Sequence, residues 1–325
     1  KAKETNIMRK IYIAECDQNG GVYTYDLYDD GRAVLLSKTD VDRPMYLAKQ
    51  NGKLYVLLRE AFPSNMSGLA VYGLDAAGNI KEKLYTVPVH GVCGCHLCVT
   101  KQEEVYIVNY LSGNVVRLPE QVVSHKGTCG PNRERQDMPH THFVGQTPEG
   151  QYMAVTDLGL DTITLYDKAL HQMTATHLPP GSGPRHLAFS EDGQTLFCVN
   201  ELSSTVSALA YKDGTLQLLD TVSILPKDYR GFSTAAAIRV QGGLIYASNR
   251  GHDSIACLSF SERKLHLLNI ASCGGSGPRD FNLFDDLLVC TNEGSNNVTF
   301  FRVNGAELTK LDTELSLKGP LCVIG

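Results

Sequence analysis

The chain repeats one arrangement of apolar and polar positions seven times. In each repeat a short apolar segment ends in a polar position, a tight turn follows, and a second apolar segment begins. The first segments are 11–13, 54–56, 105–107, 152–154, 196–198, 245–247 and 288–290, and their partners begin at Val22, Leu69, Val115, Ile163, Val206, Ile255 and Val298. Successive repeats lie 43 to 51 residues apart. This period is typical of propellers with one four-stranded blade per repeat. We therefore predict an all-β fold, a seven-bladed β-propeller.

A second recurring element precedes each polar position by about a dozen residues. Its seven copies are 43–46, 94–96, 140–142, 183–186, 233–236, 277–280 and 319–321. Several contain proline, which fits the first residue of a strand better than its interior. We expect each copy to open the innermost strand of a blade. The last copy stands at the C-terminus, whereas segment 11–13 has no inner strand before it, so residues 321–324 are predicted to complete the N-terminal blade and close the ring.

Length and composition limit the domain organisation and the partners. The 325 residues are 42% apolar and 20% charged, as in an ordinary globular protein. We predict one propeller domain over residues 8–325 and an N-terminal tail over residues 1–7. The net charge of −5, without a basic block, argues against nucleic acid as a partner. With no apolar run of 18 residues and no signal-peptide core, we expect no membrane partner and a cytoplasmic location. Monomer and dimer both stay open.

The ten cysteines are not spaced like a disulfide framework. One cluster, Cys93, Cys95, His96 and Cys98, has residue types that bind zinc. In an extended segment, however, Cys95 and His96 point to opposite faces, so one ion could not take all four side chains. We predict no metal and no cofactor.

The segment from Pro119 to Pro139 departs from the repeat. It reads as a long polar loop, and loops of this length are often functional. It leads directly into His140 and His142.

Charged and polar side chains gather where the inner strands begin and the second strands end. The first set is His96, His142, Arg185, His186, Arg279 and Asp280, and the second is Cys16, Arg59, Tyr110, Asp157, Glu201, Arg250 and Glu293. The fold would place them as two stacked rings around the axis. Buried charges need a partner or a ligand, and guanidinium groups match carboxylate or phosphate, so this set favours an anionic ligand. Pairs such as Arg185–Glu201 could equally be purely structural.

Several motifs resemble one known family, the lactonase-type seven-bladed propellers. They are 181–186 (GSGPRH), 198–202 (CVNEL), 130–142 with Pro-His-Thr-His, 157–161 (DLGLD) and 248–251 (SNRG). The family includes propeller-type 6-phosphogluconolactonases and carboxy-muconate lactonizing enzymes. The resemblance implies a catalytic site of His142, Arg185, Glu201 and Arg250. Substrate contacts are expected from Arg185, Arg250, His186, Asp157, His96 and Arg279.

Three functions are compatible with these residues. The first is hydrolysis of a sugar-acid lactone, with 6-phosphogluconolactone as first candidate and a small anionic lactone as partner. His142 or Glu201 would then be the base and Arg185 and Arg250 would stabilise the oxyanion. The second is a cycloisomerase acting on an unsaturated polycarboxylate such as carboxy-muconate. The third is a non-enzymatic binding module, which would require the channel charges to pair with one another.

Overall fold

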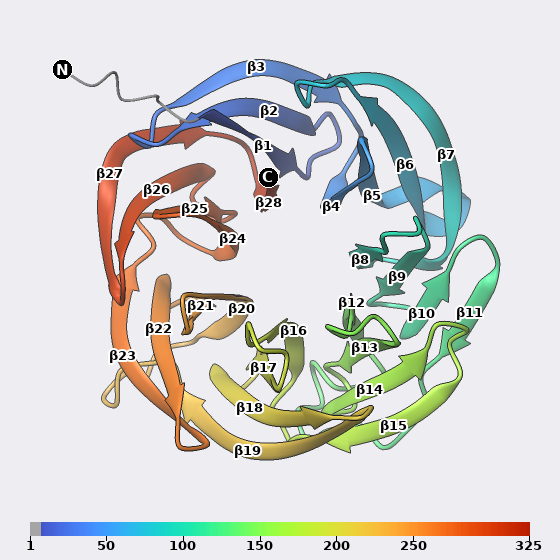
Figure 1. The fold of residues 1–325 in the computed structure, drawn as a ribbon. Coiled ribbons are helices and arrows are strands. Elements are labelled where there is room, and N and C mark those ends of the chain that lie inside the picture. The colour runs from blue at the N-terminus through green and yellow to red at the C-terminus, as the bar shows by residue number, and fades with distance from the viewer. Residues whose placement is uncertain (1–7) are drawn as a thin grey trace.

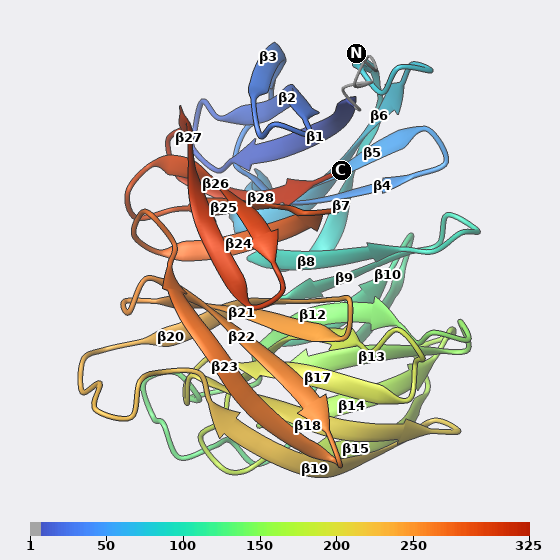
Figure 2. The same cartoon turned by 60° about the vertical axis from the view of Figure 1, so that its left-hand side comes forward.

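The structure, a computed structural model, describes residues 8–325; the predicted tail over residues 1–7 lies outside the described residues. Seven four-stranded antiparallel sheets stand around a common axis (Figure 1). The only helical element in residues 8–325 is a 3-10 turn, η1 (Pro63–Asn65). The predicted all-β, seven-bladed propeller is confirmed. In the rotated view of Figure 2, the blades follow one another around this axis.

Each blade runs from an inner strand at the axis to an outer strand at the rim. Blade 1 contains β28 (Pro320–Ile324), β1 (Met8–Glu15), β2 (Gly21–Tyr28) and β3 (Ala33–Asp40). Blade 2 contains β4 (Pro44–Gln50), β5 (Lys53–Phe62), β6 (Met66–Leu74) and β7 (Ile80–Val92). Blade 3 contains β8 (Gly94–Val99), β9 (Val105–Asn109), β10 (Asn114–Arg117) and β11 (Gln121–Ser124).

The other four blades follow in chain order. Blade 4 contains β12 (Thr141–Gln146), β13 (Tyr152–Asp157), β14 (Thr162–Asp167) and β15 (Gln172–His177). Blade 5 contains β16 (Pro184–Phe189), β17 (Thr195–Asn200), β18 (Thr205–Lys212) and β19 (Thr215–Ser223). Blade 6 contains β20 (Thr234–Gln241), β21 (Leu244–Arg250), β22 (Ser254–Ser261) and β23 (Lys264–Ser272). Blade 7 contains β24 (Pro278–Phe284), β25 (Leu287–Asn292), β26 (Asn297–Asn304) and β27 (Glu307–Ser316).

The ring closes between the two ends of the chain. β28 pairs with β1 in antiparallel register, with Ile13 opposite Val323 and Ala14 opposite Cys322. Figure 1 shows the C-terminal strand beside the dark blue first strand, on the inner side of the blade. The predicted closure is therefore confirmed.

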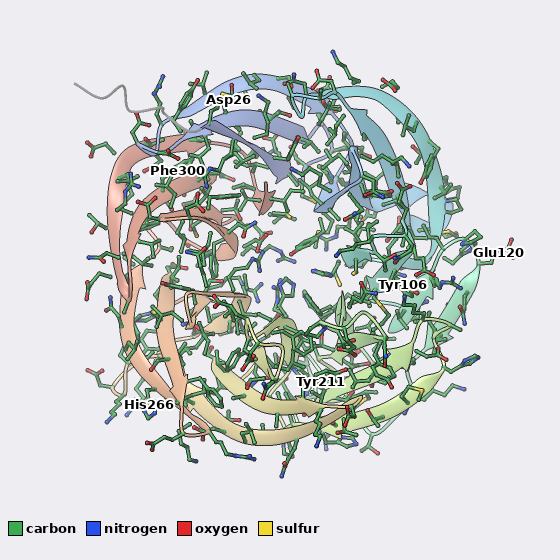
Figure 3. All side chains as sticks on the ribbon, in the orientation of Figure 1. Asp26, Tyr106, Glu120, Tyr211, His266 and Phe300 are labelled. Atoms are coloured by element: carbon green, nitrogen blue, oxygen red, sulfur yellow. The ribbon has the colours of Figure 1, made fainter. Side chains whose placement is uncertain are left out.

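Alternation along the strands explains why the apolar segments contain few polar residues. In β1, Ile11 and Ile13 pack against blade 7, while Tyr12 and Ala14 pack against blade 2. Both faces of such a strand are buried, so both must be apolar. The buried core is accordingly divided into seven clusters, one between each pair of neighbouring blades. Burial of each Ile, Leu or Val stabilises the ring by about 1.5–3 kcal/mol. Figure 3 shows Tyr106 and Phe300 inside this wall, whereas Glu120 and His266 project from the rim.

The recurring asparagine at the end of the second strand has a structural function. Asn109, Asn200, Asn249 and Asn292 are fully buried. The Asn200 amide donates to Thr205 and Ser207, and the Asn292 amide donates to Thr299. These bonds tie the second strand to the third across the turn, and they satisfy amide groups that would otherwise be costly to bury.

The segment 119–139 is not a loop throughout. Residues Gln121–Ser124 form β11, which pairs with β10 and completes blade 3. Its β-branched Val122 and Val123 fit a strand, and a blade without a fourth strand would expose the edge of β10. The irregular part therefore begins only after β11.

Every inner strand carries a β-bulge near its start. Its pairing with the second strand skips one residue, or two in blade 6, and the skipped residues are Met45, Cys95, His142, Arg185, Ala236 with Ala237, Arg279 and Leu321. A bulge re-aims side chains by breaking the alternation of the strand. These residues form what we call the upper layer. The next residue of each strand, such as Tyr46, His96, Phe143 or His186, belongs to the lower layer.

Candidate active site

A cavity of about 210 Å³ opens where the inner strands begin and the second strands end. It is lined by Met45, Arg59, Cys93, Cys95, Tyr110, Arg135, His142, Glu201, Arg250 and Arg279. The lining combines upper-layer residues, residues in or just after the second strands, Cys93 between β7 and β8, and Arg135 from the segment between β11 and β12. Three larger hollows, of about 710, 600 and 400 Å³, lie between blades 2 and 3, between blades 3 and 4, and between blades 6 and 7. The axial cavity is lined by four arginines, whereas the hollow between blades 2 and 3 is lined by one, Arg117.

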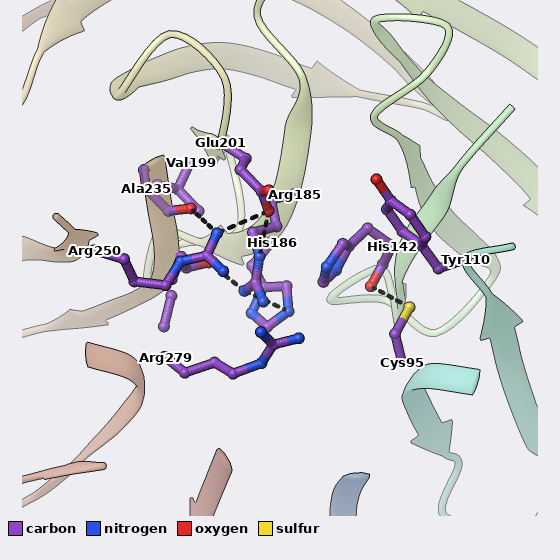
Figure 4. Close-up of polar contacts among 12 residues, drawn as sticks. Cys95, Tyr110, His142, Arg185, His186, Val199, Glu201, Ala235, Arg250 and Arg279 are labelled. Atoms are coloured by element: carbon purple, nitrogen blue, oxygen red, sulfur yellow. Dashed lines mark hydrogen bonds and ion pairs between the residues drawn. The ribbon is translucent and has the colours of Figure 1, made fainter. Parts of the chain in front are cut away.

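Glu201 is the electrostatic centre of the cavity. Its Oε1 accepts from Arg135 Nη2 at 2.5 Å. Its Oε2 is 2.9 Å from Arg185 Nε and 3.0 Å from Arg250 Nη2 (Figure 4). Burial alone would raise the pKa of Glu201, but the guanidinium groups, Arg250 first and then Arg185, hold it far below its usual range. The carboxylate therefore stays ionised and is a weak base.

Arg185 lies beneath the cavity rather than on its wall. Its side chain is 3% exposed, and its Nη1 donates to the Ala236 carbonyl at 2.6 Å and lies 3.3 Å from His186 Nε2. Together with the bond from Nε to Glu201, these contacts fix the guanidinium in place. Burial and then the nearby Arg250 lower its pKa. Arg185 thus orients Glu201, and the cavity lining does not include it.

His142 lines the cavity on the blade 4 side. Its imidazole is buried, and its Nδ1 has no hydrogen-bond partner. No hydrogen bond within residues 8–325 holds Nε2 either. Burial, followed by the charge of Arg185, lowers the pKa of His142 well below its ordinary value. The ring is therefore neutral at neutral pH and free to accept a proton.

His96 and His186 belong to the lower layer. The ring centroid of His96 lies 4.3 Å from that of Tyr46, 4.3 Å from that of Phe143 and 5.1 Å from that of His186. Neither histidine lines the cavity. In the same layer, Asp280 is paired with Arg239 at 2.7 Å. This aromatic and ionic packing closes the channel below the cavity.

Asp157 is likewise placed away from the cavity. Its Oδ2 is 2.9 Å from His125 Nδ1, and its Oδ1 accepts from the backbone amides of His140 and Leu160 at 2.8 and 3.1 Å. The carboxylate is completely buried and used within the fold. It anchors the start of β12, which carries His142, and we do not propose it as a substrate ligand.

Of the predicted site residues, His142, Glu201, Arg250 and Arg279 meet at the cavity, and Arg185 supports them. Sequence analysis did not name Arg135 as a site residue, although it lies in the segment suspected of function. Arg59 and Tyr110 were in the predicted rings but were not selected. The Tyr110 hydroxyl accepts from Arg135 at 3.3 Å, and its ring stacks on His140 at 4.2 Å.

The described part of the chain shows no cluster of three or more His, Cys, Asp or Glu side chains arranged to hold a metal ion. Cys93 and Cys95 line the cavity instead, and the Cys95 thiol lies 3.5 Å from the carbonyl oxygens of Thr141 and His142. Between residues 8 and 325, no helix has the length and apolarity needed to span a bilayer.

Comparison with known proteins agrees with this architecture. The family model described as "Lactonase, 7-bladed beta-propeller" matches residues 10–324. An uncharacterized protein from Staphylococcus aureus (strain USA300) is 32% identical, over 94% of this chain and 96% of its own. A solved structure from Lactobacillus plantarum has a TM-score of 0.88 at 29% identity, covering 98% of this chain and 99% of the other. A candidate 6-phosphogluconolactonase from Bacteroides fragilis has a TM-score of 0.89 at 25% identity, covering 100% and 99%. The chain belongs to the lactonase family of seven-bladed β-propellers.

Proposed function

We propose that the protein hydrolyses a sugar-acid lactone, with 6-phosphogluconolactone as the first candidate. The observation that carries this proposal is a neutral, unpartnered imidazole, His142, in a cavity rich in guanidinium groups. Lactone hydrolysis needs a base for water and positive charge for the oxyanion. The family membership and the likeness to the Bacteroides fragilis protein support the same reaction.

The two candidates for the base are the Glu201 carboxylate and the His142 imidazole. We assign the base to His142, because its imidazole has no hydrogen-bond partner whereas both oxygens of Glu201 are paired with guanidinium groups. Three guanidinium groups hold Glu201 ionised and make it a poor proton acceptor. His142 would take a proton from water while the water oxygen bonds to the lactone carbonyl carbon. The tetrahedral intermediate would then break its ring C–O bond, and the leaving oxygen would receive the proton from His142. Water and lactone are consumed, and one hydroxy acid is formed.

Arg250 is suited to stabilise the oxyanion. Its guanidinium reaches the cavity between Glu201 and Arg279, and its Nη2 also donates to the Ala235 carbonyl at 3.2 Å (Figure 4). The fixed charge costs little reorganisation during the reaction, and one such donor contributes about 3–4 kcal/mol. An anionic substrate would also offset the arginine charges that depress the pKa of His142, making it a stronger base when substrate is bound.

The test is a lactone panel followed by pH-stat, with phosphorylated and plain sugar lactones. We expect release of acid well above the spontaneous rate for at least one sugar lactone. Rates equal to the enzyme-free background for the whole panel would overturn the proposal.

The surplus of positive charge favours one second candidate. Five arginines, Arg59, Arg135, Arg185, Arg250 and Arg279, stand in or under the cavity against two carboxylates, Glu201 and Glu293. Such a surplus would also suit an unsaturated polycarboxylate, so the cycloisomerase stays an alternative. Spectroscopic loss of carboxy-muconate, without activity on lactones, would favour it. The internal pairing expected of a binding module is found around Glu201, but it leaves Arg59 without an ion pair.

A further inference from the structure

Arg59 differs from every other arginine of the cavity. Arg135 and Arg250 pair with Glu201, and Arg279 Nη1 lies 3.2 Å from Glu293 Oε2. The Arg59 guanidinium forms no ion pair or hydrogen bond within residues 8–325, yet it lines the cavity. An unpaired guanidinium on a concave wall is a ready site for an anion.

Arg279 is the second positive group on this side. Its partner Glu293 has a side chain that is 41% exposed, so solvent screens the pair and leaves it weak. In Figure 4 the Arg279 guanidinium points into the space between His142 and Arg250. Arg59 and Arg279 also share a neighbour: both lower the pKa of the Cys16 thiol, against the larger effect of burial, which raises it to about 11. Both guanidinium groups therefore lie near Cys16, which directly follows β1 of blade 1.

The order of the blades separates Arg59 from the reacting groups. Arg59 is on β5 of blade 2 and Arg279 is on β24 of blade 7, so they flank blade 1. Glu201 follows β17 of blade 5, and His142 is on β12 of blade 4. In a ring of seven, blade 5 stands opposite blades 1 and 2. A ligand that spans the cavity therefore meets the reacting groups at one end and Arg59 at the other, while the Arg279 guanidinium reaches from blade 7 toward the middle of the cavity.

We propose that Arg59 and Arg279 form an anchor for a phosphate group carried by the substrate away from its lactone carbonyl. Two guanidinium groups balance a phosphate dianion and match its oxygens better than two lysines would. The anchor makes the enzyme selective for phosphorylated lactones. This inference rests on the proposed hydrolysis and adds the substrate class and a specificity-determining residue.

The kinetic test compares 6-phosphogluconolactone with unphosphorylated gluconolactone. For Arg59→Gln we expect kcat/KM on the phosphorylated lactone to fall about ten- to a hundredfold, because a charge-assisted contact is lost. Activity on the plain lactone should stay within about twofold of wild type. Arg43→Gln is the matched control: Arg43 lies in the same blade, next to β4, but does not line the cavity and pairs with Asp42 at 3.2 Å. It should behave as wild type on both substrates.

A binding test keeps the anchor separate from catalysis. Calorimetry with 6-phosphogluconate, gluconate and inorganic phosphate needs no turnover, so it decides on the anchor even if no lactone is hydrolysed. We expect wild type to bind 6-phosphogluconate more tightly than gluconate by about tenfold or more, and Arg59→Gln to lose that preference. Equal affinity for the two acids in wild type would overturn the anchor. So would an unchanged preference in Arg59→Gln, or equally tight, Arg59-dependent binding of carboxy-muconate.

Discussion

Two layers of side chains fill the centre of the ring, and they come from adjacent residues of the same inner strands. The upper layer consists of the bulge residues, of which Met45, Cys95, His142 and Arg279 line a cavity of about 210 Å³. The lower layer consists of the residues that follow, such as Phe143 and Asp280. The gap between the two layers, lined by bulge residues such as Arg185 and by His186 and Asp280 of the lower layer, has a volume of about 10 Å³, which barely admits one water.

The comparison shows that access, rather than protonation, distinguishes the histidines of the two layers. Burial is the first cause that lowers the pKa of His96, to about 3, and it also lowers those of His142 and His186 well below normal. All three rings are neutral. Only His142 meets the cavity, whereas His96 is packed between aromatic rings and His186 lies beside Arg185. A shift of one residue along a strand thus converts a packed histidine into one that can react.

Replacing one histidine of each layer by phenylalanine tests most directly whether the two layers differ in function. We expect His142→Phe to lower kcat on 6-phosphogluconolactone by about 10²–10⁴-fold, since it removes the base. His96→Phe keeps an aromatic ring between Tyr46 and Phe143 and should stay within about threefold of wild type. Initial rates by pH-stat measure both. Losses of similar size in the two variants would mean that the layers do not differ in function.

The fold could be predicted almost fully because the repeat is periodic and both faces of the inner blade strands are buried. The closure of the ring followed from one inner strand left over at Leu321–Ile324 and one missing before Ile11. The strand β11 was missed because its apolar run, Val122 and Val123, is only two residues long.

The site could be predicted only in part, because the alternation of apolar and polar residues along a strand does not reveal where a β-bulge interrupts it. His142 and Arg279 reach the cavity as bulge residues, and the same entry elements sent His96 and His186 to the layer below. The long segment before His140 indicated function and its family motif includes Arg135, but nothing in the sequence gave that arginine a role. Only the fold brings Arg135 to Glu201, 66 positions further along the chain.

The second largest effect is expected on stability, when the central carboxylate, Glu201, is removed. Glu201→Gln leaves Arg185 buried without an anion, and breaking a buried pair in this way costs about 3–5 kcal/mol. Glu293→Gln breaks a pair that is open to solvent and should cost about 1 kcal/mol or less. Urea denaturation gives both free energies of unfolding. A loss for Glu201→Gln as small as that for Glu293→Gln would show that solvent reaches Arg185.

The neutral histidines should make the protein sensitive to acid. Each has a folded-state pKa below its unfolded value of about 6.5, so the unfolded chain binds more protons as the pH falls through this range. The free energy of unfolding should therefore be fully present above pH 6.5. Below it, the loss is about 1.4 kcal/mol per pH unit for each of the three histidines.

His96→Phe isolates one of these contributions. Denaturant unfolding of wild type and variant between pH 6 and 5, above the range where ordinary carboxylates titrate, should give slopes that differ by about 1.4 kcal/mol per pH unit. Identical slopes would mean that His96 is protonated in the folded state, in conflict with its aromatic packing.

The smallest expected effect concerns how Arg135 is held in the wall of the cavity. Tyr110→Phe removes the hydroxyl that accepts from Arg135 but keeps the ring stacked on His140. Arg135 retains its contact with Glu201, so kcat should not change, while KM should rise about two- to tenfold for the loss of one hydrogen bond. Tyr106→Phe, which removes a hydroxyl bonded to the Lys168 carbonyl away from the cavity, should leave KM unchanged. A fall in kcat beyond tenfold for Tyr110→Phe would instead make the hydroxyl a participant in proton transfer, and the reacting groups would then include a residue of blade 3 beside His142 of blade 4.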